Sequence, residues 1–235
     1  MRHPTPTPPD LGVSDGLAYA LFLPEGEPDA GVVVLHGGGS SKESHFDFAR
    51  GCRADGMAAL AYDARGHGES EGSFGPGAID DVFAMVELLR AHAPEVALRG
   101  SSMGGFEAIH AGARDPSIRA VVAISPAPEA GLLRFLRSGQ ELEFRCDAKA
   151  CEPWLESLDL ADAVARLGPE TSLLLMHARG DEQVPYAVSE QLYDAAHEPK
   201  RLLLLPGGHH RSVQHDLELQ AASRKFIRDA VRRRP

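Results

Sequence analysis

The residues Gly100-Ser101-Ser102-Met103-Gly104-Gly105 place a serine between closely spaced glycines, and this pattern is the strongest indication of the fold in the sequence. It follows an apolar run that predicts a strand, Val96–Gly100, and it opens a helical pattern, Phe106–Ala113. The glycines two positions on either side of Ser102 permit a sharp turn from strand to helix that a Cβ atom would block. Such a turn lifts the Ser102 hydroxyl above a sheet, at the positive end of the next helix. The alternative interpretation is a glycine-rich turn with incidental serines.

Strand patterns alternate with helical patterns on both sides of this turn. The expected strands are Leu17–Leu23, Gly31–His36, Met57–Asp63, Val96–Gly100, Ala120–Ser125, Ser172–His177 and Arg201–Leu205. The expected helices run from Ile79 to Leu89 with a stop at Pro94, over Phe106–Ala113, and from about Asp216 to Val231. Continuous apolar runs are typical of parallel strands covered on both faces. We therefore predict an α/β fold with a doubly wound, mainly parallel sheet, which Leu17–Leu23 begins as an antiparallel edge.

Residues 1–235 are expected to form a single domain, because no repeat or interdomain linker interrupts the pattern. One connection is unusually long, from 126 to 168. It carries apolar residues in helical spacing and an aromatic, namely Leu132, Leu133, Phe135, Leu136 and Trp154. We interpret this segment as a small lid inserted over a pocket. The alternative is an ordinary connection with one helix at Leu158–Leu167.

Four further motifs resemble those of the α/β-hydrolase family, and they occur in the family's order. They are His36-Gly37-Gly38-Gly39, Asp63-Ala64-Arg65-Gly66-His67-Gly68-Glu69-Ser70, His177-Ala178-Arg179-Gly180-Asp181-Glu182-Gln183-Val184-Pro185 and Pro206-Gly207-Gly208-His209-His210. With the turn at Ser102, the resemblance covers nearly the whole chain. Ala178 stands where the family often has glycine, a departure that we do not expect to affect the chemistry.

The resemblance implies a catalytic triad of Ser102, Asp181 and His210, in the chain order that this fold uses. The residues support the same triad by themselves. Groups that follow the carboxyl ends of parallel strands converge at one rim of the sheet. A serine hydroxyl is a poor nucleophile until an imidazole takes its proton, and a carboxylate holds that imidazole in the required tautomer.

Two assignments within the triad have alternatives. His209 is the alternative base, because some family patterns put the base directly after a glycine, whereas a G-x-x-H count from Gly207 selects His210. Glu182 and Glu129 are the alternative acids. We favour His210 and Asp181.

The oxyanion hole is expected to have two backbone N–H donors. One is that of Met103, which directly follows Ser102. By resemblance the other is that of Gly38, with Gly39 as the next candidate, because successive glycines let the backbone approach a substrate oxygen. We expect His36 to orient this loop and Asp63 to be a buried hydrogen-bond acceptor in its own turn.

These residues predict a serine esterase that cleaves carboxylic esters of small to medium acyl groups through an acyl-enzyme. A thioester, amide, lactone or carbon–carbon substrate on the same triad is the alternative, since fold does not fix substrate. The alternative from another class is a non-catalytic binding module. No cofactor is needed, and the spacing of His209, His210 and His215 matches no common zinc pattern. The expected partner is a small-molecule ester.

Charge and composition exclude other partners. The net charge of −10 disfavours binding to nucleic acid or to an anionic membrane surface. No run of apolar residues is long enough to insert into a bilayer, and the first ten residues do not resemble a signal peptide. The three cysteines, an odd number, favour a cytoplasmic protein with reduced thiols, although a bridge between Cys146 and Cys151 is compatible with the sequence. The sequence carries no signal for an oligomeric state.

Overall fold

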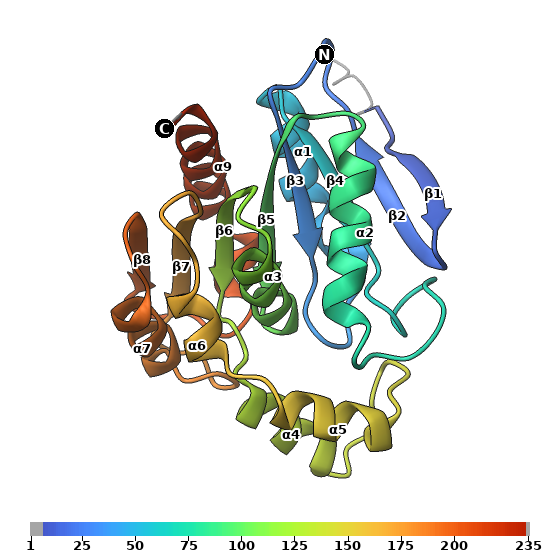
Figure 1. The fold of residues 1–235 in the computed structure, drawn as a ribbon, viewed down its shortest axis with the longest axis vertical. Coiled ribbons are helices and arrows are strands. Elements are labelled where there is room, and N and C mark those ends of the chain that lie inside the picture. The colour runs from blue at the N-terminus through green and yellow to red at the C-terminus, as the bar shows by residue number, and fades with distance from the viewer. Residues whose placement is uncertain (1–6, 234–235) are drawn as a thin grey trace.

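The computed structural model describes residues 7–233 and contains one eight-stranded sheet (Figure 1). The strand order is β1-β2-β4-β3-β5-β6-β7-β8. The strands are β1 (Asp10–Ser14), β2 (Leu17–Phe22), β3 (Ala30–Leu35), β4 (Ala58–Tyr62), β5 (Glu95–Ser101), β6 (Ile118–Ile124), β7 (Ser172–Ala178) and β8 (Lys200–Leu205). Only the pairs β1–β2 and β2–β4 are antiparallel, and the other pairs are parallel. The predicted fold class is therefore confirmed.

The antiparallel edge of the sheet has one more strand than the sequence pattern predicts. The strand at Leu17–Phe22 is antiparallel, as expected, but β1 lies outside it and forms the true edge. A tight turn at Asp15 and Gly16, both with positive φ, connects the two strands. This turn chemistry is typical of two-residue hairpins. The sequence pattern missed β1 because its apolar residues, Leu11 and Val13, face solvent.

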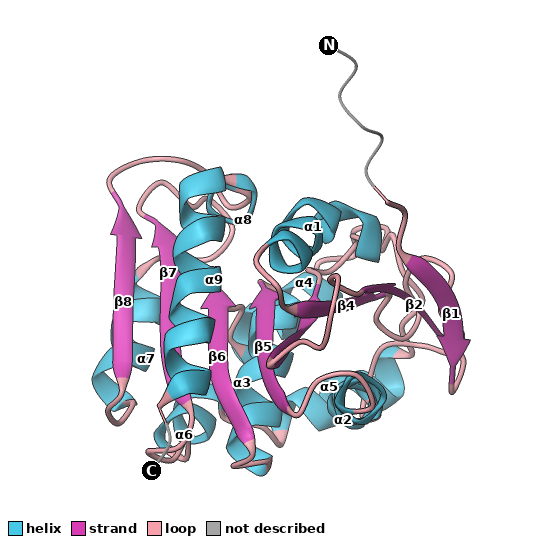
Figure 2. Ribbon diagram, turned by 90° about the horizontal axis from the view of Figure 1, so that it is seen from above, coloured by secondary structure: helices cyan, strands magenta, loops and turns pink. Residues whose placement is uncertain are grey.

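Helices cover both faces of the sheet, and each face has its own core (Figure 2). Strand side chains alternate between the faces, so that Val33 and Leu35 enter one core while Val32 and Val34 enter the other. The first core contains α2 (Ala78–Arg90), α3 (Met103–Arg114), α6 (Leu160–Ala165) and α7 (Ala187–Ala195), and it also includes the buried Cys151 and Leu155. The second contains α1 (Phe46–Ala54), α8 (Ser212–His215) and α9 (Leu217–Arg232). A short 3₁₀ helix, η1 (Lys42–His45), precedes α1.

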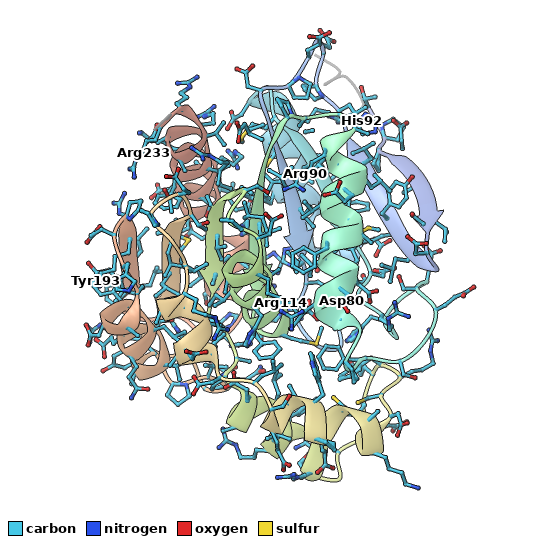
Figure 3. The ribbon with its side chains drawn as sticks, viewed as in Figure 1. Asp80, Arg90, His92, Arg114, Tyr193 and Arg233 are labelled. Carbon is cyan, nitrogen blue, oxygen red and sulfur yellow. The ribbon has the colours of Figure 1, made fainter. Side chains whose placement is uncertain are left out.

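Ion pairs join neighbouring helices at the surface of the first core. Arg114 on α3 lies 3.3 Å from Asp80 on α2, and Arg90 at the end of α2 lies 3.0 Å from Asp115 (Figure 3). Surface pairs of this kind contribute little to stability. The buried apolar side chains of the two cores therefore hold the helices on the sheet.

The long connection between β6 and β7 divides into two parts. Its last helix, α6, packs on the sheet near the helix expected at 158–167. Its first two helices, α4 (Glu129–Arg137) and α5 (Ala148–Glu156), lie outside the helical layers, beyond the carboxyl ends of the strands (Figure 1). We call residues 129–156 the cap segment. Backbone hydrogen bonds between Arg145 and Gly66, 3.0 Å, and between Phe74 and Arg145, 2.9 Å, attach it to the loop after β4.

The lengths of the helices and the state of the cysteines can be compared with the expectations from the sequence. None of the helices within residues 7–233 combines the length and the apolar composition that a bilayer crossing needs. Cys52, Cys146 and Cys151 are all free thiols, so the structure contains no bridge between the last two.

Candidate active site

The turn between β5 and α3 holds Ser102 in a strained conformation. Its φ of 53° and ψ of −115° lie in a region that non-glycine residues rarely adopt, at a cost of about 1–3 kcal/mol. The turn is fixed on both sides, because the Ser102 N–H donates to Ile124 O at 2.8 Å and its carbonyl accepts from Phe106 and Ala127. Such strain persists only where the surrounding structure enforces it. This is the sharp turn that the glycine spacing predicts.

The flanking glycines are required by close backbone approaches. A Cβ atom on Gly100 would overlap the carbonyl group of Gly104. A Cβ atom on Gly104 would lie 2.5 Å from the carbonyl oxygen of Leu35, at the end of the neighbouring strand β3. Because both obstacles are backbone atoms, they cannot rotate away as a side chain would. Only glycine fits at either position.

The loops after β7 and β8 bring Asp181 and His210 together. His210 Nδ1 lies 2.8 Å from Asp181 Oδ2 and 3.0 Å from Oδ1. The carboxylate can only accept, so Nδ1 is the donor in this contact, and Nε2 is the ring nitrogen that remains to act as a base. The Asp181 side chain is fully buried and that of His210 is nearly so.

Asp181 is held in its ionised form. Burial opposes ionisation, but hydrogen bonds from His177, His210 and the N–H groups of Val184 and Gln183 outweigh it and hold the pKa of Asp181 well below its usual range. Both N–H groups lie 2.9 Å from Oδ1. The carboxylate is therefore negative at neutral pH and can stabilise a protonated imidazole on His210.

His177 is a further member of this cluster, and the sequence alone gives it no role although it opens the motif that contains Asp181. It lies fully buried at the end of β7, with Nε2 3.1 Å from Asp181 Oδ2 and 2.9 Å from Val184 O. Its Nδ1 accepts from the Ser189 hydroxyl at 2.7 Å, which leaves the ring proton on Nε2, facing Asp181. The available signal was the H-x-x-x-D spacing after a buried strand.

The alternative residues lie elsewhere. His209 is exposed, and its Nδ1 accepts from the N–H of Arg211 at 3.3 Å. The exposed Glu182 accepts from the backbone N–H of His210 at 3.1 Å, not from its ring. Glu129 begins α4, where its Oε1 lies 3.5 Å from Nε2 of the buried His110. Asp181 is thus the carboxylate that contacts the His210 ring.

A triad also requires a hydrogen bond between the serine hydroxyl and the histidine ring, and this bond is not formed in the structure. Within the described part of the chain, no hydrogen bond joins Ser102 Oγ to His210. Catalytic hydrogen bonds are often long or poorly aligned before substrate binds, and tighten only in the complex.

The loop after β3 approaches Ser102 closely. A Cβ atom on Gly37 would lie 3.4 Å from Ser102 Cβ, and one on Gly38 would lie 3.8 Å from Met103 Sδ. His36 orients this loop as expected, because Nδ1 donates to Gly37 O at 2.8 Å while Nε2 accepts from the N–H of Ala64 at 2.9 Å. Burial lowers the pKa of His36, which keeps the ring neutral as both bonds require.

A buried ion pair anchors the far end of the same loop. The Lys42 backbone N–H donates to Asp63 Oδ1 at 2.7 Å, and its ammonium donates to Oδ2 at 2.8 Å. Burial opposes ionisation of Asp63, but the hydrogen bonds from Lys42 and from the Glu69 N–H hold its pKa below the usual value. Asp63 is the buried acceptor that the sequence predicts, and it also joins the loops after β3 and β4.

A pocket of about 500 Å³ opens above Ser102. Gly38 and Met103, the expected oxyanion-hole residues, line it together with Ser102. The cap segment supplies much of the remaining wall, including Leu132, Phe135, Leu136 and Phe144, and Phe74 and Val184 complete the apolar part. The volume lies within the range of small-molecule sites.

The chain resembles characterised folds along most of its length. Est1E from Butyrivibrio proteoclasticus, solved with ferulic acid, has a TM-score of 0.77 at 21% identity, covering 95% of this chain and 100% of that one. A soluble variant of monoglyceride lipase from Saccharomyces cerevisiae has a TM-score of 0.78 at 14% identity, covering 100% of this chain and 98% of that one. These likenesses establish the fold.

Sequence comparison identifies the family. The uncharacterised protein YfhR of Escherichia coli strain K12 is 29% identical over 190 residues, which make up 77% of this chain and 63% of YfhR. This chain therefore spans less than two thirds of that relative's length. The family model described as serine aminopeptidase, S33, matches residues 26–157, from before β3 through α5. The chain belongs to this serine aminopeptidase S33 family of α/β hydrolases.

Proposed function

We propose that the protein is a serine hydrolase that cleaves carboxylic esters of small to medium acyl groups. The observation that carries this proposal is the hydrogen bond from His210 to the ionised Asp181. The strained turn that presents Ser102 to the pocket under the cap segment supports it. An imidazole oriented by a buried carboxylate and a serine on such a turn are the two parts that acyl transfer requires.

In the proposed mechanism Ser102 Oγ attacks the ester carbonyl while His210 Nε2 takes the hydroxyl proton. The backbone N–H groups of Gly38 and Met103 stabilise the negative oxygen of the tetrahedral intermediate. The intermediate then expels the alcohol, which receives the proton from His210. Water attacks the acyl-enzyme with His210 again as base, which releases the acid and restores Ser102. Asp181 orients His210 throughout, and no cofactor takes part.

The pocket wall supports the choice of acyl group. Its aromatic and aliphatic side chains suit an apolar chain or ring, and its volume suits small to medium groups. We propose that residues 126–168 act as a lid, because the cap segment within them forms much of this wall.

The names of the esterase and lipase neighbours favour an ester among the possible acyl substrates. The family name favours an amide as the second candidate. We also propose a cytoplasmic location, which the odd number of cysteines in the sequence favours.

A substrate panel tests this proposal. The panel contains p-nitrophenyl esters of graded chain length, acyl-CoA thioesters and amino-acid p-nitroanilides, each assayed for kcat/KM. We expect the short and medium p-nitrophenyl esters to give the highest values. A higher kcat/KM for a thioester or an anilide would show that the substrate is a thioester or an amide, cleaved by the same proposed triad. No turnover of any substrate would favour the non-catalytic binding module.

The acid is tested by comparing Asp181→Asn with Glu129→Gln. Loss of the Asp181 carboxylate leaves the His210 ring without the partner that fixes its tautomer, which is expected to lower kcat by roughly 10⁴-fold. Glu129 contacts His110 instead, so its substitution is expected to leave kcat nearly unchanged. Both variants are assayed on the best ester of the panel. Full activity in Asp181→Asn with loss in Glu129→Gln would assign the acid to the loop after β6.

A further inference from the structure

Among the described residues that line the pocket above Ser102, Arg134 on α4 is the one with a charged side chain. The other lining residues within 7–233 are apolar or uncharged polar residues. Within residues 7–233, no carboxylate lies within ion-pair distance of Arg134, and no side chain or carbonyl accepts a hydrogen bond from it. An arginine at the wall of a mainly apolar pocket is therefore left without a partner.

The other arginines of the cap segment have structural partners. Arg137, on the same helix, donates to Glu152 at 2.7 Å and to Glu156 at 2.6 Å, which joins α4 to α5. Arg145 donates to the carbonyl of Gly72 at 2.9 Å and to that of Ser70, which ties the cap segment to the loop after β4. Among the arginines of the cap segment, Arg134 is therefore the one that makes no hydrogen bond or ion pair with the described residues.

The charges around the pocket make this guanidinium distinctive. The chain as a whole carries a net charge of −10, and Glu143 lies beside Gly39, with Oε2 3.1 Å from the point that a Cβ atom there would occupy. Arg134 therefore supplies a local positive charge in an acidic protein. Because the Arg134 side chain is exposed, water solvates its unpaired charge, and the charge destabilises the protein little while the pocket is empty. A bound acyl chain would cover it, and the apolar wall would then strengthen its attraction for an anion.

We propose that Arg134 binds a carboxylate at the far end of the acyl group, so that the preferred substrates are monoesters of dicarboxylic acids. The ester carbonyl would lie at Ser102, the methylene chain along the apolar wall, and the free carboxylate at Arg134. Ser138, Gln140 and Gln183 line the same pocket and add polar groups to a wall that otherwise suits an alkyl chain. This inference rests on the proposed esterase function and names its substrate class.

The experiment compares two matched series of p-nitrophenyl esters. One series consists of the monoesters of adipic, pimelic and suberic acid, and the other of neutral alkanoates of the same chain length. For the wild type we expect kcat/KM to favour the charged series at one or more lengths. Arg134→Gln is expected to lose about 10–100-fold on the charged series, the effect of a lost charge-assisted hydrogen bond, and to change little on the neutral one.

Arg137→Gln is the matched control, because it removes the same charge from the same helix but disrupts only the contact with α5. We expect it to affect both series equally. Where either series is turned over, the inference is wrong if the wild type does not favour the charged series, or if Arg134→Gln lowers both series in parallel.

Binding of free suberic acid, measured by calorimetry, separates this inference from the proposed function. We expect wild type to bind it and Arg134→Gln to bind it at least about tenfold more weakly. Such binding without turnover of either ester series would support the carboxylate site and overturn the esterase. A different result would be turnover of neutral esters while the wild type and Arg134→Gln bind suberic acid equally or not at all. This result would overturn the carboxylate site and leave the esterase proposal standing.

Discussion

Ser102→Ala is expected to lower kcat on the best ester by at least about 10⁴-fold while leaving the melting temperature nearly unchanged. The loss follows because Ser102 lines the pocket, whereas the other hydroxyl at the turn, that of Ser101, is buried and does not. Stability should persist because, among the described residues, the Ser102 hydroxyl makes no hydrogen bond that the substitution removes. Steady-state kinetics and a thermal melt measure the two quantities.

Ser101→Ala is the matched control for this result. Its hydroxyl is buried beside Ser102 and has no hydrogen-bond partner within residues 7–233. We expect its kcat to remain within a few-fold of the wild type. Loss of activity in Ser101→Ala with retention in Ser102→Ala would move the nucleophile by one residue.

The second large effect distinguishes the two adjacent histidines. His210→Gln is expected to lower kcat by about 10⁴-fold or more, because glutamine cannot take the proton of Ser102. His209→Gln is expected to stay within about tenfold, the scale of one lost contact of about 1.4 kcal/mol. The hydrogen bond to Asp181 belongs to His210, whereas His209 faces solvent. The measurements are kcat and the rate of labelling by a fluorophosphonate. The reverse pattern would transfer the general base to His209.

The interior of the sheet was predictable because its strands are continuous apolar runs. The predicted strands from Gly31–His36 to Arg201–Leu205 all correspond to observed ones, with ends that differ by at most two residues. The pattern missed elements with little apolar surface to bury. Strand β1 is exposed on its apolar side, and α7 buries only Ser189 and Leu192. Helix α1 contains Gly51, which interrupts a helical pattern that Phe48 and Cys52 would otherwise support.

The candidate site was predictable as far as its motifs are local. The glycines around Ser102 and the chain order of serine, aspartate and histidine are visible in the sequence itself. Contacts between distant loops are not, which is why the roles of Lys42 and His177 emerged only from the structure. The choice between His209 and His210 depends on the backbone after β8. There Gly208 adopts a φ of 88°, and the following turn directs His209 outward and His210 toward Asp181.

Treatment with a fluorophosphonate, with the adduct located by mass spectrometry of the peptides, tests whether Ser102 is the nucleophile that His210 activates. We expect one adduct, on Ser102, that forms in the wild type and in His209→Gln but not in Ser102→Ala or, over the same time, in His210→Gln. An adduct on Ser101 or on a serine outside the pocket, or labelling that persists in Ser102→Ala, would show that Ser102 is not this nucleophile.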